Sequence, residues 1–323
     1  MTKAIVFHET GGPEKLLWED IDVGDPKPGQ IRVKQTTAGL NYIDVYFRTG
    51  LYPFPTPGII GMEGAGVVEA VGEGVTEFAV GDRVTYGGQP GSYAEARCMP
   101  TMKVVKLPDE IDDTTASAMM LKGLTAHYLL FRTYAVQPGD TILVYAAAGG
   151  VGLILCQWAK ALGATVIGCV GSQEKAELVK ANGCDHAILY RDEDVVERVK
   201  EITDGKGVPV VYDSIGKATF MSSLDCLQPF GTMVSYGNAS GKVDPFDINI
   251  LAPKGSLYVT RPTVGTHTAT RELVTEATDR IFEALISGKI KAHVNQTYEL
   301  KDAAQAHIAL EARETTGSTV FTI

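Results

Sequence analysis

The sequence predicts an α/β protein with two domains: a doubly wound parallel sheet of the Rossmann type and a domain rich in β-strands. Between residues 123 and 262, short apolar runs alternate with amphipathic helical patterns, as the strands and crossover helices of a parallel sheet do. Residues 1–122 are instead rich in glycine, proline and short alternating runs, which is typical of antiparallel strands. The 323 residues, 45% of them hydrophobic, suffice for two cores.

The β-rich domain is predicted from alternating runs at residues 30–34 and 65–72, and from a turn at 81–84 that leads into another strand. Residues 263–323 return to this pattern after two helices, over 272–287 and near 302–312, and end in an apolar strand at 318–323. We therefore expect the C-terminus to rejoin the first domain. The predicted domains are 1–122 plus 263–323, and 123–262.

The sheet domain contains the most informative segment, where an apolar run at residues 141–145 leads into Ala-Ala-Ala-Gly-Gly-Val-Gly and then a helical pattern. Residues 147, 149 and 152 have the spacing of the G-x-G-x-x-G fingerprint of dinucleotide-binding turns, with Ala147 in the first slot. Gly149 would let the backbone approach a pyrophosphate, and Gly152 would let the helix pack closely, its N-terminus facing the anion. A flexible turn without a ligand is the alternative.

The residues after the next apolar run indicate which of the two nicotinamide dinucleotides, NAD or NADP, the domain binds. That run ends at Val170, and Gly171 stands where an acidic side chain would bind the ribose of NAD. Ser172 and Lys175 supply a hydroxyl and a cation, which suit a 2′-phosphate, and Tyr190 could add a contact. The sequence therefore favours NADPH. The alternative is that Ser172 only caps a helix and that Lys175 is a solvated charge.

The loops after the later strands are further candidates, because ligands of open α/β sheets lie at the carboxyl ends of the strands. These loops are residues 213–216, 237–241 and 260–262, and their glycines and amides suit contact with ribose and nicotinamide. Each loop taken alone could be a plain turn.

Composition and charge disfavour several other classes. The net charge is −10 with no long Lys or Arg run, which disfavours nucleic acid and anionic membranes as partners. The longest uncharged stretch, residues 141–159, contains glycines and fits strand, turn and helix better than a membrane span. The N-terminal apolar run is too short for a signal peptide, and the five cysteines are scattered, so we expect a cytoplasmic protein with reduced thiols.

Motifs along the whole chain resemble the medium-chain dehydrogenase/reductase superfamily. They are residues 38–44, 58–66, 81–84, 146–152 and 163–164. Residues 121–126, 212–216, 235–241 and 255–262 are similar to the NADPH:quinone oxidoreductases related to zeta-crystallin. The resemblance implies a GroES-like fold for the β-rich domain and reduction of quinones by NADPH in a cleft between the domains. It also implies a homodimer, with residues 255–259 as an edge strand, since an unpaired apolar edge favours association.

Two departures from the superfamily's zinc alcohol dehydrogenases argue against a metal. Those enzymes place a Cys in the first motif and a His in the second, where this chain has Asn41 and Met62, which cannot serve as those ligands. The segment that carries their structural zinc is also missing, and no His or Cys has metal-ligand spacing from another. We therefore expect a zinc-independent reaction, because a quinone is already electrophilic and the cofactor carries the chemistry.

The predicted catalytic residues are Asn41, Tyr46 and Tyr52, whose amide and phenol groups can donate to acceptor oxygens. The resemblance supports Asn41 most strongly, and ordinary packing is the alternative for the tyrosines. The predicted cofactor-binding residues, of which Tyr128 and Arg313 rest on resemblance alone, are Tyr128, Ala148, Gly149, Gly150, Val151, Gly171, Ser172, Lys175, Tyr190, Ser214, Tyr236, Gly237, Asn238, Thr260, Arg261 and Arg313.

Two other functions remain open at this point. One is the NADPH-dependent reduction of enones or other activated alkenes, which uses the same fold and cofactor. The other is a binding role, such as the binding of AU-rich RNA by some zeta-crystallin relatives, which the acidic charge disfavours.

Overall fold

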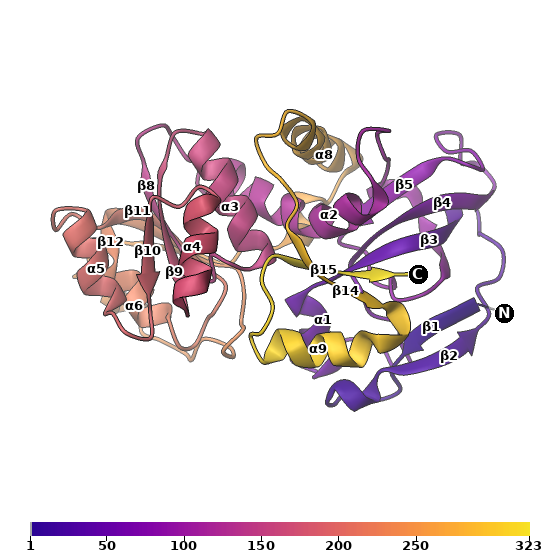
Figure 1. Cartoon of the computed structure of the whole chain (residues 1–323), viewed down its shortest axis with the longest axis horizontal. Coiled ribbons are helices and arrows are strands. Elements are labelled where there is room, and N and C mark those ends of the chain that lie inside the picture. Colours follow the sequence, from indigo (N-terminus) through magenta and orange to yellow (C-terminus); the bar gives the residue numbers. More distant parts are fainter. Residues whose placement is uncertain (1) are drawn as a thin grey trace. The chain divides into compact units, whose positions relative to one another are not determined.

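The computed structural model describes residues 2–323 and divides into two compact units (Figure 1). Unit 1 comprises the described residues up to Leu124 together with His267–Ser287 and Ala292–Ile323. Unit 2 comprises Thr125–Thr266 and Gly288–Lys291. One unit contains a parallel sheet flanked by helices and the other is rich in β-strands, which confirms the predicted α/β fold class.

Unit 2 is built on a six-stranded sheet with the order β10-β9-β8-β11-β12-β13, in which every neighbouring pair is parallel. Its strands are β8 (Thr141–Val144), β9 (Thr165–Val170), β10 (His186–Leu189), β11 (Val208–Asp213), β12 (Leu227–Ser235) and β13 (Tyr258–Thr260). The chain moves from β8 to one edge and then returns to build the other edge from β11. The switch point between β8 and β11 is where sheets of this kind bind ligands.

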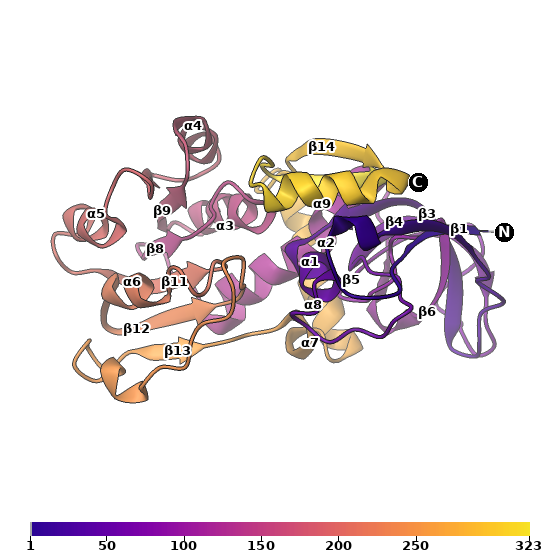
Figure 2. The same ribbon diagram turned by 90° about the horizontal axis from the view of Figure 1, so that it is seen from below.

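Helices cover both faces of this sheet. They are α3 (Gly150–Ala161), α4 (Gln173–Ala181), α5 (Val195–Ile202) and α6 (Phe220–Asp225), with short helical turns η3 (Leu129–Thr133) and η4 (Ile248–Leu251). Figures 1 and 2 show α3 and α4 on one side of the sheet and α5 and α6 on the other. Because both faces are covered, the central strands are largely apolar: Ile142, Leu143 and Val144 of β8 are completely buried.

The predicted edge strand is in the right place, but its predicted start is wrong. Strand β13 pairs with β12 alone and is an edge of the sheet. The prediction began this strand at Gly255, whereas Gly255 and Ser256 have φ angles of 115° and 56° and belong to a turn. A left-handed backbone cannot continue a strand, so β13 begins at Tyr258.

Unit 1 contains a seven-stranded sheet and a two-stranded sheet. The larger sheet has the order β14-β15-β3-β4-β5-β7, with β6 also paired to β3, and the smaller one pairs β1 with β2. The strands are β1 (Thr2–Val6), β2 (Leu17–Ile21), β3 (Gln30–Leu40), β4 (Glu63–Val71), β5 (Arg83–Gly87), β6 (Ala96–Pro100), β7 (Val104–Lys106), β14 (Val294–Glu299) and β15 (Ser318–Thr322). Strand β15 pairs antiparallel with β3, so the C-terminal segment rejoins the first lobe as predicted.

Unit 1 also contains helices and short helical turns. They include α1 (Tyr42–Arg48), most of α2 (Asp113–Tyr128), α8 (Arg271–Ile286) and α9 (Ala303–Glu311), with the short turns η1 (Pro13–Lys15), η2 (Thr101–Lys103) and η5 (Leu300–Asp302); α7 (Val264–His267) ends at the first residue of this unit's second segment. Helix α2 packs tightly on β3, because a Cβ on Gly39 would lie 2.2 Å from the carbonyl oxygen of Ser117. This approach brings α2 close to the start of α1.

Candidate active site

The glycine turn of unit 2 joins β8 to α3 and uses its glycines for two different purposes. A Cβ on Gly152 would lie 2.3 Å from the carbonyl oxygen of Ala146 and 2.6 Å from that of Ala147, so only glycine lets α3 pack here. A Cβ on Gly149 would meet a single atom, at 3.2 Å, so this side of the turn is open. Gly149 is the N-cap of α3, and the N–H groups of the helix's first turn, at Gly150 and Val151, have no intrahelical acceptor. The turn therefore offers N–H donors to an anion.

The predicted 2′-phosphate residues come together after β9. A Cβ on Gly171 would lie 2.7 Å from the hydroxyl of Tyr190, so this tyrosine covers the glycine. Ser172 caps α4 by accepting a hydrogen bond from the backbone N–H of Lys175 at 3.3 Å. The hydroxyl hydrogen of Ser172 can still be donated, because capping uses only the oxygen as an acceptor.

The loop after β11 is fixed by the carboxylate of Asp213, which is completely buried. One oxygen accepts from the backbone N–H groups of Ile215 and Gly216, at 2.6 and 3.1 Å. The other accepts from the hydroxyls of Thr219 and Ser223, at 2.6 and 2.9 Å. Because its two oxygens accept four hydrogen bonds, Asp213 fixes the loop that carries Ser214.

The loop after β12 packs directly on that loop. A Cβ on Gly237 would lie 2.3 Å from the carbonyl oxygen of Ser214, so glycine is required for the contact. Burial raises the pKa of Tyr236, and a hydrogen bond with Ser214 opposes this effect. Arg261, which follows β13, donates from Nη1 to the carbonyl oxygen of Ser235 at 2.8 Å. The later loops with predicted cofactor residues thus lie at the carboxyl end of one sheet.

In unit 1 the three predicted catalytic residues lie at α1 and the loop that follows it. Asn41 is the N-cap of α1 and is only 8% exposed. The ring of Tyr46 packs on that of Tyr52, with centroids 5.1 Å apart, and on that of Tyr42 at 5.4 Å. Tyr46 is buried and Tyr52 is half-buried. The segment therefore combines one amide with a cluster of phenol rings.

Two charged residues near Asn41 were not predicted from the sequence: Glu63, which contacts Asn41, and Lys122, which contacts Glu63. The carboxylate of Glu63 is completely buried and accepts from Asn41 Nδ2 at 2.7 Å. The ammonium group of Lys122, also buried, donates to the same oxygen of Glu63. Each residue stands in an otherwise uncharged stretch, residues 49–68 and 114–131, and this isolation of a charge was the available signal.

A second buried polar cluster lies at α1 and includes Asp44, Tyr93 and His307. Asp44 accepts from the backbone N–H of Asn41 at 2.9 Å and from the hydroxyl of Tyr93 at 3.1 Å. Burial nevertheless raises the pKa of Asp44 to about 7. Burial, together with the nearby guanidinium of Arg48, lowers the pKa of His307 to about 3. At neutral pH, His307 is therefore uncharged and Asp44 titrates.

Tyr128 and Arg313 are the two cofactor-binding residues that were predicted by resemblance alone. Tyr128 is buried at the end of α2. Arg313 is exposed after α9, has a φ of 62°, and lowers the pKa of Tyr42 by its charge, although burial dominates and the net pKa of Tyr42 is raised.

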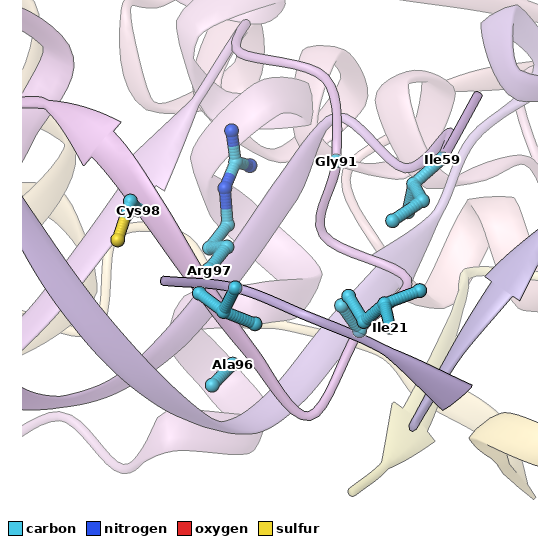
Figure 3. Close-up of a pocket in the computed structure, with 8 residues that line it drawn as sticks. Ile21, Ile59, Gly91, Ala96, Arg97 and Cys98 are labelled. Atoms are coloured by element: carbon cyan, nitrogen blue, oxygen red, sulfur yellow. The ribbon is translucent and has the colours of Figure 1, made fainter. Parts of the chain in front are cut away.

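A separate cavity of about 240 Å³ in unit 1 contains none of the predicted site residues (Figure 3). It is lined by Ile21, Val23, Ile59, Gly91, Ala94, Ala96, Arg97 and Cys98. The guanidinium of Arg97 is engaged elsewhere, donating to the carbonyl oxygens of Gln89 and Pro90. The cavity is thus mainly apolar.

Within residues 2–323, no group of three or more His, Cys, Asp or Glu side chains could hold a metal ion. The described helices include none that is long and apolar enough to cross a membrane.

Two segments of the chain match known protein families. Residues 27–109 match the alcohol dehydrogenase GroES-like domain, and residues 150–281 match the model described as zinc-binding dehydrogenase. The two matches together define a medium-chain dehydrogenase/reductase. The chain is 52% identical over 323 residues to the quinone oxidoreductase of Pseudomonas aeruginosa, covering 99% of each protein.

Two further relatives extend the comparison. The crystal structure of Escherichia coli quinone oxidoreductase complexed with NADPH superimposes with a TM-score of 0.98 at 48% identity, covering 99% of this chain and 100% of that one. The 2-haloacrylate reductase of a Burkholderia species is 46% identical over 330 residues, covering 99% of each. The chain belongs to the quinone oxidoreductase family of the medium-chain dehydrogenase/reductases and is an oxidoreductase.

Proposed function

We propose that the chain reduces quinones with NADPH and without zinc. The observation that carries this function is the glycine turn at β8, whose open side at Gly149 and close packing at Gly152 fit a dinucleotide pyrophosphate at the N-terminus of α3. When bound, NADPH supplies the reducing equivalents. Near-full-length similarity to quinone oxidoreductases, one of them solved with NADPH, supports the same function.

The cofactor-binding residues of this proposal are the ones predicted above. Backbone N–H groups of Ala148, Gly150 and Val151 bind the pyrophosphate, which the open side of Gly149 lets approach, since the N–H of Gly149 itself donates to the carbonyl oxygen of Ala146 at 2.9 Å. Ser172, Lys175 and Tyr190 bind the 2′-phosphate after β9. The loops that carry Ser214, Tyr236–Asn238 and Thr260–Arg261 contact the ribose and nicotinamide. This assignment is supported by Asp213 and Gly237, which fix two of these loops at the carboxyl end of the sheet. Tyr128 and Arg313 are proposed by resemblance.

The acceptor-binding residues are Asn41, Tyr46 and Tyr52. Asn41 Nδ2 has two hydrogens and donates to Glu63 at 2.7 Å and, at the longer distance of 3.4 Å, to the carbonyl oxygen of Gly39. The weaker of these two bonds can be exchanged for one to a quinone oxygen. The rings of Tyr46 and Tyr52 supply a planar apolar surface for a quinone, and their hydroxyls supply further donors. Donors aimed at an oxygen that gains negative charge stabilise the transition state.

A second substrate class, activated alkenes, is favoured by one specific relative, the 2-haloacrylate reductase. The decisive experiment is steady-state oxidation of NADPH with 1,4-naphthoquinone and, separately, with 2-chloroacrylate, each with and without a chelator. We expect turnover with the quinone that the chelator leaves unchanged. Turnover of 2-chloroacrylate alone would assign the chain to alkene reduction, and loss of quinone turnover on chelation would contradict zinc independence.

We also propose a homodimer that forms at the edge strand β13. The outer edge of β13 leaves backbone groups unpaired, and exposed apolar side chains occur on and near it in unit 2, including Tyr258 (59% exposed) and Ile248 (71%). Light scattering coupled to size-exclusion chromatography should report twice 34.5 kDa. Tyr258→Glu should shift the protein toward monomer, whereas Ile308→Glu, at a 55% exposed apolar position of unit 1, should not.

We place the protein in the cytoplasm. Its five cysteines are free, and four of them are buried, as is typical of proteins from reducing compartments.

A further inference from the structure

The ion pair between Glu63 and Lys122 is buried inside unit 1, where a charged pair is costly unless it is fully hydrogen-bonded. Glu63 is completely buried and Lys122 is 5% exposed. Glu63 accepts three hydrogen bonds: from Lys122 Nζ, from Asn41 Nδ2 at 2.7 Å, and from the backbone N–H of Leu121 at 2.7 Å. One carboxylate thus joins the start of α1 to the middle of α2.

The contact with Glu63 determines how the Asn41 amide is turned. An ionised carboxylate only accepts hydrogen bonds, so it can bind the NH₂ end of an amide but not the carbonyl end. With Nδ2 bound to Glu63 at 2.7 Å, the second N–H of Asn41 has a fixed direction, and its acceptor in this structure is the carbonyl oxygen of Gly39 at 3.4 Å, a weak bond that an acceptor oxygen can replace. If the amide turned over, its carbonyl oxygen would face Glu63, and two acceptors would oppose each other.

Lys122 donates to the same carboxylate oxygen of Glu63 that accepts from Asn41. A buried carboxylate without a cation tends to take up a proton, because the charged form is poorly solvated. A protonated Glu63 could donate to the carbonyl oxygen of Asn41 and so stabilise the wrong orientation. The glycine at position 39 makes room for this ion pair, since a Cβ on Gly39 would lie 2.4 Å from Glu63 Oε1.

We propose that Glu63 and Lys122 are positioning residues for quinone reduction, which hold the amide of Asn41 with an N–H available to the acceptor oxygen. The proposal rests on the function proposed above for Asn41. It accounts for a charged pair in a place where an apolar pair of similar volume would pack without the desolvation penalty.

The test is a double-mutant cycle with Asn41→Ala, Lys122→Met and the double variant, measured as kcat and KM for 1,4-naphthoquinone and as Kd for NADPH. We expect Asn41→Ala and Lys122→Met each to lower kcat at least tenfold with NADPH affinity unchanged. In the Asn41→Ala background, Lys122→Met should lower kcat less than twofold further, because it acts through Asn41.

A matched control is Arg83→Met. Arg83 on β5 also forms an ion pair with α2, through Asp113 at 2.6 Å, but neither residue has a hydrogen bond to Asn41. This variant should lose thermal stability and keep its kcat. If Lys122→Met does not fold, Glu63→Leu with Lys122→Met replaces the ion pair by a neutral, apolar pair that has no acceptor for Asn41, and this variant should fold and still lose kcat at least tenfold.

The outcomes separate the two proposals. If Asn41→Ala retains wild-type kcat, the role of Asn41 is wrong and the positioning proposal fails with it. If Asn41→Ala lowers kcat and Lys122→Met does not, Asn41 keeps its role and the positioning proposal alone is overturned. The same holds if the loss of kcat in the double variant equals the product of the two single losses. Wild-type kcat in the neutral-pair variant would overturn it as well.

Discussion

In unit 2 the candidate cofactor site is built from backbone, whereas in unit 1 the candidate acceptor site is built from buried side chains. The turn at β8 works because Gly149 and Gly152 lack side chains. Asn41 instead depends on charged and polar neighbours, among them Glu63 and Asp44, that are removed from water. The first site is therefore sensitive to added volume, and the second to changes in charge and protonation.

The largest expected effect comes from the polar site of unit 1, through Asp44. Its pKa of about 7 lies above the ordinary 3.8, so the folded protein binds this proton more tightly than the unfolded chain does. The associated stability is fully present below pH 3.8 and is lost as the pH rises through 7. Asp44→Asn keeps an acceptor and removes the titration, so its stability relative to wild type should rise between pH 4 and 8, by up to about 4 kcal/mol.

Urea unfolding of both proteins across this range measures the difference. His307, with a pKa of about 3, has the opposite effect, because stability falls as the pH drops below its ordinary 6.5. This effect is common to both proteins and cancels in the comparison. A constant difference between the two proteins from pH 4 to 8 would mean that Asp44 does not titrate in this range.

The next effect is expected in the backbone site of unit 2. Gly152→Ala places a Cβ 2.3 Å from the carbonyl oxygen of Ala146, so we expect α3 to shift, with a loss of about 1–3 kcal/mol in the free energy of unfolding. Binding of NADPH, followed by fluorescence titration, should weaken strongly. Gly265→Ala is the control, because its nearest atom would be 3.8 Å away, and both properties should be retained. Unchanged NADPH binding in Gly152→Ala would contradict a pyrophosphate at this turn.

A smaller effect distinguishes the two roles of Ser172. Ser172→Asp preserves the N-cap of α4, because Asp caps helices about as well as Ser, so stability should change by less than about 0.5 kcal/mol. A carboxylate would repel a 2′-phosphate and accept from a ribose hydroxyl. The ratio of the Kd for NADH to the Kd for NADPH should therefore fall at least tenfold. An unchanged ratio would leave Ser172 as a helix cap only.

The cofactor site of unit 2 was more predictable from the sequence than the acceptor site of unit 1. The glycine turn was predictable because its requirements are local: an apolar strand, glycines at fixed spacing and a helix. The buried contacts of unit 1 join residues far apart in the chain, 22 positions for Asn41 and Glu63, 59 for Glu63 and Lys122, and 214 for Tyr93 and His307. Their pairing depends on strand register and on the packing of α2, which no local pattern specifies. The start of β13 was missed because the left-handed conformation of Ser256 is not a property of serine.

Steady-state oxidation of NADPH and of NADH with 1,4-naphthoquinone is the sharpest test of a quinone reductase that selects NADPH. The proteins to compare are wild type, Lys175→Ala, and Lys180→Ala, which removes an exposed lysine from the same helix α4. We predict that wild type and Lys180→Ala prefer NADPH and that Lys175→Ala loses this preference by roughly tenfold or more. Equal use of the two cofactors by wild type, or full selectivity in Lys175→Ala, would contradict the proposed phosphate site.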